Sequence, residues 1–400
     1  MLLAHVPVPE EDATLDRRYN WEIRSYRHVE RPCAMDAFTW REDVELRAQL
    51  RQASGIAEEL AALSSDWDRI LRLTAFVHGL SAHQGWDEAP DLSGLRLLAD
   101  VRAGKVTFRC VEFSHMLQQL LAAFGYPARV VGLRREGSQA GLGKSHVVCD
   151  VWRGEDGKWI ELDVQLNTAY RDRSGRLLSA LEVHDLVRAG RHAEISLTRE
   201  AQMRENWEDA GAKDSLSPED IEEVQGFTRE EIWEMLPDHG DYDGFTHFWL
   251  DNHYHLTFNQ RYGLERPKAL TGAADGGTFF YSDPGDVPPL AFQGMRQTVT
   301  YVQDRRTIDF PLEGVELQWV LHEVAEDAPP AATRRLTLLL RHSMPWFHHF
   351  CVTVDGKAVE VRDEALVLSL HPGENTVEVT AVNDLGRHGS TAQVVFFVPL

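Results

Sequence analysis

The stretch CVEFSHMLQQLLAAFGYPARVVGL, residues 110–133, contains the clearest structural pattern of the chain. Its apolar residues recur at helical spacing, which predicts a helix that begins at Cys110. The helix should end at Gly125, because a residue without a Cβ atom suits the position after a helix, and Pro127 follows. Cys110 then lies at a helix N-terminus, where free backbone N–H groups and the helix dipole favour a thiolate over a thiol.

Three strand patterns follow this helix. They cover residues 128–133, 146–152 and 159–164, with a polar loop at 134–145 and a turn at Gly157-Lys158. If the last two strands pair as a hairpin, the end of one lies beside the start of the other.

Alternation along these strands determines which side chains can meet. His146 and Cys149 lie on opposite faces of their strand, so Cys149 is a poor partner for that imidazole. In the next strand Asp163 shares a face with Glu161 and Trp159. A hairpin would bring Asp163 beside His146, where it would hold the ring in the tautomer whose other nitrogen faces a sulfur.

Cys110, His146 and Asp163 thus occur in an order that suits thiol catalysis. Each residue alone has a commoner structural explanation: an isolated Cys is mostly a small buried hydrophobe, and an Asp after a strand is mostly a turn residue. A nucleophilic thiol needs a base and an orienting carboxylate that converge from separate elements. Together the three residues favour a thiolate acyl-transfer site.

Four pieces of the chain, within about residues 55–170, resemble the transglutaminase-like superfamily. They are Cys110-x-Glu112-Phe113, then Gly125-Tyr126-Pro127-Ala128-Arg129-Val130-Val131, then His146 at the start of a strand, then Trp159-x-x-x-Asp163. The resemblance implies an α+β fold with a papain-type core, in which a Cys-bearing helix packs on an antiparallel sheet. It also implies Cys110 as nucleophile, His146 as general base and acid, and Asp163 as the residue that orients the ring.

The chain departs from this family just before the Cys. The family usually has Gly two residues before the nucleophile, whereas this chain has Phe108, with Gly104 further upstream. Family members often use an upstream Trp or Gln as an oxyanion donor beside the backbone N–H of the Cys. Trp86 and Gln84, in AHQGWDE, are the candidates here, and an ordinary loop role is the alternative.

These features predict a cysteine-dependent enzyme that acts on an amide or other acyl bond of a peptide, a protein or a small amide. Water as acyl acceptor gives a peptidase or amidase, and an amine gives a transferase. The compact spacing also resembles the arylamine acetyltransferases, although Cys110 lies late in the chain for that family. The alternative from another class is a catalytically inactive scaffold that acts as a protein- or glycan-binding adaptor. No cofactor and no metal are implied.

Two other motifs suggest ligands that we do not expect. AGLGKSH resembles the end of a phosphate-binding loop, but the first Gly would fall at Ser138 and a strand follows instead of a helix. HFWLDNHYH contains four candidate ligands, but their spacing matches no standard zinc pattern and Cys partners are missing. We expect a structural or cleft-lining role, with two of the imidazoles on one strand face. The four residues are His247, Asp251, His253 and His255, and His348 and His349 carry less weight.

Composition limits the partners and the compartment. The chain has 41 basic and 63 acidic residues among 400, a net charge of −22, which disfavours nucleic acid and anionic membranes as partners. No apolar run reaches membrane-spanning length, and MLLAHVPVPEEDATL lacks the pattern of a signal peptide. The four widely spaced Cys residues indicate free thiols and a reducing compartment. We therefore expect a cytoplasmic protein, whose oligomeric state the sequence does not specify.

Shifts in composition predict four regions. Residues 1–50 are expected to form an N-terminal extension packing on the core, 51–175 the catalytic core, 176–293 a mostly helical extension and linker, and 294–400 an immunoglobulin-like β-sandwich. Further helices are expected from Leu46 onward, within 57–80, at 179–187 and at 218–235. Gly- and Pro-rich segments mark a boundary near residue 290.

The C-terminal region alternates between short apolar strands and turns. Seven runs, from RQTVTYV at 296–302 to TAQVVFFV at 391–398, and a hairpin signal at Asp355-Gly356 predict a small β-sandwich. The segment at 372–398 resembles immunoglobulin-like modules appended to bacterial enzymes. Such a module either binds a glycan or protein or braces the catalytic domain, because a sandwich by itself specifies no ligand.

Overall fold

The chain folds into two compact units. Residues Ala34–Asp309 form the core unit, and Met1–Cys33 together with Phe310–Leu400 form the sandwich unit. The computed structural model describes residues 21–28, 44–82, 89–134, 145–198, 250–259, 278–281, 283, 299–309, 311–321, 329, 334–361 and 364–399.

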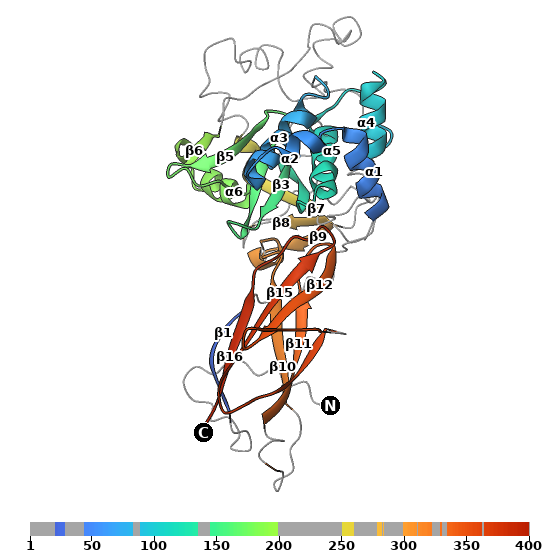
Figure 1. Cartoon of the computed structure of the whole chain (residues 1–400). Helices are drawn as coiled ribbons and strands as arrows, with labels where there is room; N and C mark the ends of the chain where they lie inside the picture. The colour runs from blue at the N-terminus through green and yellow to red at the C-terminus, as the bar shows by residue number, and fades with distance from the viewer. Residues whose placement is uncertain are drawn as a thin grey trace, which may run out of the picture. The chain divides into compact units, whose positions relative to one another are not determined.

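The helices of the core unit surround the one that begins at Cys110. Their bounds are α1 (Val44–Ser54), α2 (Ala57–Ala61), α3 (Asp66–His78), α4 (Gly94–Arg102) and α5 (Cys110–Ala123). The prediction for α5 is confirmed, and Gly125 follows the helix with a φ of 82°. Helix α5 contacts α1, α3 and α4 and also strands β2 and β3 (Figure 1). It is therefore the central helix of this unit, and α4 is a helix that the sequence interpretation missed.

The core unit contains an eight-stranded sheet in the order β6-β5-β4-β3-β2-β7-β8-β9. All neighbouring strands are antiparallel except β8 and β9, which pair in parallel. The α+β fold class, with a Cys-bearing helix packed on an antiparallel sheet, is confirmed. The strands are β2 (Ala128–Arg134), β3 (Ser145–Arg153), β4 (Lys158–Asp163), β5 (Thr168–Asp172), β6 (Ile195–Leu197), β7 (His255–Asn259), β8 (Thr278–Tyr281) and β9 (Val299–Val302).

Helix α6 (Ala180–Arg188) confirms the helix expected at 179–187. Ser179 caps it, because its Oγ accepts a hydrogen bond from the Glu182 backbone N–H at 3.2 Å, and the Glu182 carboxylate accepts one from the Ser179 N–H at 2.9 Å. Helix α6 contacts β4, β7 and the 3-10 helices η2 (His192–Glu194) and η5 (Asp251–Tyr254). The helix expected at 218–235 lies outside the described residues.

The sandwich unit contains two antiparallel sheets that share one apolar core. Their strand orders are β1-β16-β15-β12-β13 and β10-β11-β14. Residues such as Leu338 on β11 and Val379 on β15 belong to the same buried cluster. This strand-rich architecture is that of a β-sandwich, whereas the immunoglobulin-like assignment stays a prediction. The strands are β1 (Glu22–Arg27), β10 (Val315–Leu321), β11 (Arg335–His342), β12 (Phe347–Val354), β13 (Lys357–Val359), β14 (Ala365–Ser369), β15 (Gly373–Asn383) and β16 (Ala392–Val398).

Two strands belong to a different unit from the one that the sequence analysis predicted for them. Strand β1, expected in an extension that packs on the core, instead pairs with β16, and Trp21 packs edge-on against Phe396 with ring centroids 5.4 Å apart. Strand β9 comes from the first run assigned to the sandwich, but it pairs with β8 in the core sheet. Alternation identifies a strand and its buried face, but not its partner. The remaining region boundaries stay predictions.

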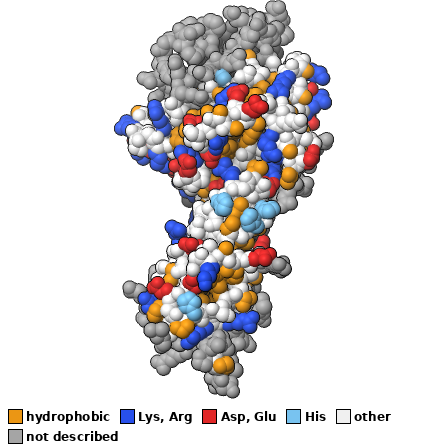
Figure 2. Space-filling model, viewed as in Figure 1, with side chains coloured by type: hydrophobic (Ala, Val, Ile, Leu, Met, Phe, Trp, Pro, Cys, Tyr) orange, Lys and Arg blue, Asp and Glu red, His pale blue; other side chains and the backbone are white. Residues whose placement is uncertain are grey.

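Charged side chains are distributed over both units. On the face shown in Figure 2, acidic and basic side chains lie among apolar ones, so the net negative charge does not form one continuous acidic patch there. Within the described part of the chain, no helix combines the length and the apolar character needed to cross a bilayer.

Candidate functional site

Cys110 is the first residue of α5 and is partly exposed. The segment before it is anchored by Phe108, which is fully buried and packs edge-on against Phe113, with ring centroids 5.3 Å apart. The Phe108 backbone N–H donates to Ser81 Oγ at 3.1 Å. A large aromatic side chain therefore fixes the approach to the helix at the position where the resembling family usually has Gly.

Glu112 fixes the first turn of α5 from inside. Its buried carboxylate accepts hydrogen bonds from the Arg109 backbone N–H at 3.0 Å, from Arg109 Nη2 at 2.8 Å and from the Ala89 backbone N–H at 3.1 Å. A glutamate at the third helical position that binds back to the N-cap backbone is half of a capping box. This contact ties the chain at Ala89 to the start of the Cys helix, and the sequence interpretation did not identify it.

His146 and Asp163 meet as the hairpin prediction expected. Strands β3 and β4 pair with Cys149 opposite Leu162, so His146 near the start of β3 lies close to Asp163 at the end of β4. His146 Nε2 lies 2.9 Å from Asp163 Oδ2, and both side chains are buried. Because Asp163 engages Nε2, the other ring nitrogen, Nδ1, is left for the Cys110 side chain, with which His146 also forms a hydrogen bond.

Opposite charges dominate the electrostatics of this pair. Burial alone would lower the pKa of His146, but the charge and hydrogen bond of Asp163, together with Cys110, raise that pKa to about 10. Burial alone would raise the pKa of Asp163, but His146 and the Leu166 backbone N–H outweigh it and lower that pKa. The arrangement therefore favours an imidazolium and a carboxylate.

Two groups that the sequence interpretation missed hold the Asp163 carboxylate. The Leu166 backbone N–H donates to Oδ1 at 3.1 Å, and the Tyr170 hydroxyl donates to Oδ2 at 3.4 Å. Burial and the nearby carboxylates raise the pKa of Tyr170 well above its usual value, so it stays a donor. The turn after β4 supplies the Leu166 donor and β5 supplies Tyr170, and no sequence motif marks such local contacts.

The His-rich stretch contributes one residue to this face of the sheet. His253 belongs to the 3-10 helix η5 and His255 to β7, so the expectation that both lie on one face of a strand is wrong. His253 Nε2 lies 2.8 Å from Glu161 Oε1, and both side chains are buried. Among the residues that the structure describes, no group of three His, Cys, Asp or Glu side chains forms a candidate metal site. His247 lies outside the described residues.

The other sequence candidates differ in how far the structure describes them. Gln84 and Trp86 lie outside the described residues. Cys149 is buried among apolar side chains on the opposite face of β3 from His146, and burial followed by the charge of Asp150 raises its pKa well above the usual value. Cys149 is therefore unsuited to be the nucleophile.

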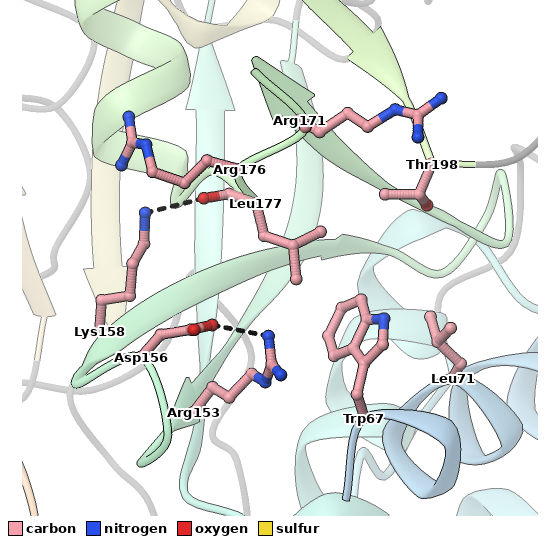
Figure 3. A pocket seen from close by; sticks show the side chains of 10 residues that line it. Trp67, Leu71, Arg153, Asp156, Lys158, Arg171, Arg176, Leu177 and Thr198 are labelled. Atoms are coloured by element: carbon pink, nitrogen blue, oxygen red, sulfur yellow. Dashed lines mark hydrogen bonds and ion pairs between the residues drawn. The ribbon is translucent and has the colours of Figure 1, made fainter. Parts of the chain in front are cut away.

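A pocket of about 630 Å³ lies away from these residues, near the turn between β3 and β4. Figure 3 shows Trp67 and Leu71 of α3 on one side of it and Arg171 on another. Arg153, which also lines it, is seven residues along β3 from His146, or roughly 23 Å in an extended strand. Arg153 forms an ion pair with Asp156 at 2.7 Å. The Arg153 end of the pocket is thus distant from His146.

Comparison with known proteins identifies the core. The model of the transglutaminase-like superfamily matches residues 55–164. A solved structure described as a crystal structure of a TGase is 22% identical, with a TM-score of 0.21, over 30% of this chain and 31% of that chain. The chain thus spans less than a third of the length of that protein. No curated protein matches the chain.

Proposed function

We propose that this chain, whose residues 55–164 form a transglutaminase-like domain, is a cysteine-dependent hydrolase or acyltransferase. The Cys110 Sγ attacks the carbonyl carbon of an amide or related acyl group and forms a thioester. The bond from that carbon to the leaving nitrogen breaks, and His146 gives its proton to the departing amine. The thioester then transfers its acyl group to water or to an amine. The proton released from that acceptor passes to His146, which restores the imidazolium and the Cys110 thiolate.

The observation that carries this proposal is the buried His146–Asp163 pair together with the contact from His146 to Cys110. Asp163 holds the ring so that its other nitrogen faces the sulfur, and the imidazolium form favours a thiolate beside it. The start of α5 adds backbone N–H groups and the positive end of the helix dipole. The Cys110 backbone N–H would donate to the developing oxyanion, and Gln84 and Trp86 are the proposed second donors.

The transglutaminase-like core suggests a peptide or protein substrate, and a small amide fits the same chemistry. The Cys–His–Asp arrangement treats water and amines alike as second acceptors, because either can take the acyl group from the thioester. The acceptor is therefore a matter for substrate tests after the nucleophile has been established.

Alkylation of single thiols tests this proposal directly. Full-length protein is treated with iodoacetamide across a pH series, and peptide mass spectrometry gives a separate rate for each Cys. Cys351, which is exposed on β12, is the reference thiol in a His349→Gln background, because His349 Nε2 lies 3.6 Å from its Sγ, and buried Cys149 reports that the core unit is folded. At about pH 6 we expect Cys110 to react at least about tenfold faster than Cys351, because a thiolate and not a thiol attacks.

Two isosteric variants assign the effect to the triad. His146→Gln and Asp163→Asn should each reduce the Cys110 rate toward that of Cys351, while Cys149 stays unlabelled. If wild-type Cys110 reacts no faster than Cys351 and neither substitution matters, the enzyme proposal fails. The adaptor alternative, a transglutaminase-like scaffold that binds a protein or glycan, would then take its place.

A further inference from the structure

Strands β3 and β4 bury three carboxylates on one face of the core sheet. Asp150, Glu161 and Asp163 are each 0% exposed. Asp150 lies directly opposite Glu161 in the strand register, and Asp163 follows Glu161 by two residues, or about 7 Å along the strand. Like charges at such separations repel strongly out of water. Each carboxylate therefore needs its own compensating group.

Each of the three carboxylates has such a compensating group. Arg129, on β2, donates to Asp150 from Nη2 at 2.8 Å and from Nε at 3.0 Å. The catalytic candidate His146 pairs with Asp163. The middle carboxylate, Glu161, pairs with His253 of η5, and its second oxygen, Oε2, has no hydrogen-bond partner among the described residues. The Cys110 site is thus the last of three buried acid–base pairs in a row.

We propose that Glu161 and His253 are positioning residues for the triad, which set the charge and orientation of Asp163 and, through it, of His146. This inference rests on the proposed function, because it assigns the pair a role in the same site. Neither residue touches the reacting atoms. A buried ion pair seldom increases stability over an apolar pair of the same shape, so the burial of Glu161 and His253 here calls for another role.

Charge compensation is the first way in which the pair acts on Asp163. Burial raises the pKa of Glu161, His253 works to lower it, and the nearby carboxylates work to raise it further. His253 also works to lower the pKa of Asp163. The His253 side chain therefore favours the ionised form of two neighbouring acids. The titratable groups that face these acids are His146 and Asp150 from β3, Tyr170 from β5 and His253 from η5.

Packing is the second way in which the Glu161–His253 pair acts on Asp163. The Tyr170 ring meets the His253 ring edge-on, with centroids 5.8 Å apart, while its hydroxyl donates to Asp163. His253 itself is held from two sides: its Nδ1 lies 3.0 Å from the Leu250 carbonyl oxygen, and its own carbonyl accepts from His184 Nδ1 at 2.7 Å. The Asp163 carboxylate is thereby linked to α6 and η5 through a chain of buried groups.

The test uses three variants of the full-length protein that keep the shapes of the side chains. They are Glu161→Gln, His253→Gln and the double variant, and the readout is the pH midpoint of fast Cys110 alkylation. Glu161→Gln removes a negative charge and leaves His253, so the midpoint should fall, by about half a pH unit. His253→Gln removes the ring that favours both carboxylates, so the midpoint should rise by a similar amount. The double variant should return close to wild type.

His184→Gln is the matched control. It also removes a buried imidazole that contacts His253, but burial lowers the pKa of His184, so this substitution removes no charge near neutral pH. The Gln amide can still donate to the His253 carbonyl in place of Nδ1, so we expect the midpoint of this variant to equal that of wild type. Should His253→Gln fail to fold, the comparison of Glu161→Gln with the double variant still gives the His253 contribution.

The outcomes separate this inference from the proposed function. One outcome overturns the positioning role alone: Cys110 alkylation depends on His146, but neither Glu161→Gln nor His253→Gln shifts its pH midpoint. Shifts of the same sign in both single variants and in the control also overturn it, because they would reflect a general disturbance of packing. A wild-type profile without any dependence on His146 overturns both proposals.

Discussion

Successive residues of β3 and β4 face two contrasting environments. Cys149, Val151, Ile160 and Leu162 point into the apolar cluster under α5. Their immediate neighbours, among them Asp150 and the acids of β4, form the row of buried acid–base pairs on the other face. The same strands therefore carry an apolar core on one face and buried acid–base pairs, with apolar Val148 among them, on the other, and one-residue alternation keeps the two faces apart.

The contrast shows which face supplies stability. Each buried CH₂ group of the apolar face contributes about 0.8 kcal/mol through the hydrophobic effect. Buried ion pairs lose about as much in desolvation as they gain from attraction, so the charged face adds little net stability. Breaking one pair is nevertheless costly, because it leaves a charge without a partner. The charged face is thus a constraint that the candidate site imposes on the fold.

The largest expected effect comes from breaking the pair furthest from Cys110. Arg129→Met leaves Asp150 without its guanidinium and also removes the bond from Nη1 to the Ile308 carbonyl oxygen, at 2.6 Å. We expect the core unit to lose about 4 kcal/mol of unfolding free energy. Urea unfolding is followed by thiol labelling of Cys149, which is buried in this unit.

A compensating substitution separates charge from packing in that result. Adding Asp150→Asn neutralises the acid and keeps an oxygen for the Ala180 N–H, which donates to Asp150 Oδ1 at 3.2 Å. We expect the double variant to recover part of the lost stability. A loss below about 1 kcal/mol in Arg129→Met would mean that Asp150 does not remain buried and charged in the folded protein.

The sequence predicted the apolar face better than the charged one. Helix α5, the three strands after it and the opposite faces of His146 and Cys149 follow from local periodicity, which is a property of neighbouring residues. The contact of His253 with Glu161 joins residues 92 positions apart. No periodicity encodes such a contact, and the His-rich stretch predicted a structural or cleft-lining role without naming a partner.

Strand partners were unpredictable for the same reason. Strand β1 completes a sheet with β16 from the other end of the chain, and β9 leaves the series of sandwich runs to pair with β8. A strand pattern shows which side chains are buried, whereas the choice of partner depends on shape matching between distant segments. The capping contact at Glu112 was missed because Arg109, not Ser or Thr, precedes the helix.

A matched substitution on the apolar face sharpens the comparison. Leu162 is buried under α5 and lies between Glu161 and Asp163 in sequence. Leu162→Ala should lower the unfolding free energy of the core unit by about 3 kcal/mol, because apolar burial is lost and a cavity is left behind. Because its side chain points away from the charged layer, the pH midpoint of Cys110 alkylation should stay that of wild type. A shifted midpoint in folded Leu162→Ala protein would show that the two faces are not independent.

The smallest expected effect comes from His115, a buried imidazole within α5. Neither ring nitrogen of His115 has a hydrogen-bond partner among the described residues, and burial lowers the pKa of His115 to about 4. Because this pKa lies below the unfolded value of about 6.5, the folded state favours the neutral ring, and stability is lost as the pH falls from about 6.5 toward 4. At about pH 5 the loss from this group should be about 2 kcal/mol.

His115→Leu fills a similar volume and cannot take up a proton. The difference in unfolding free energy between wild type and this variant, measured by urea titration at several pH values, isolates His115 from His146. The raised pKa of His146 acts in the opposite direction, since its stabilisation is complete below about pH 6.5 and is lost as the pH rises toward 10. Between about pH 7.5 and 5, we expect the unfolding free energy of the variant to rise by about 2 kcal/mol relative to that of wild type. A difference that stays constant with pH would mean that His115 reaches water in the folded protein, and that the layer under α5 is less apolar than its neighbours indicate.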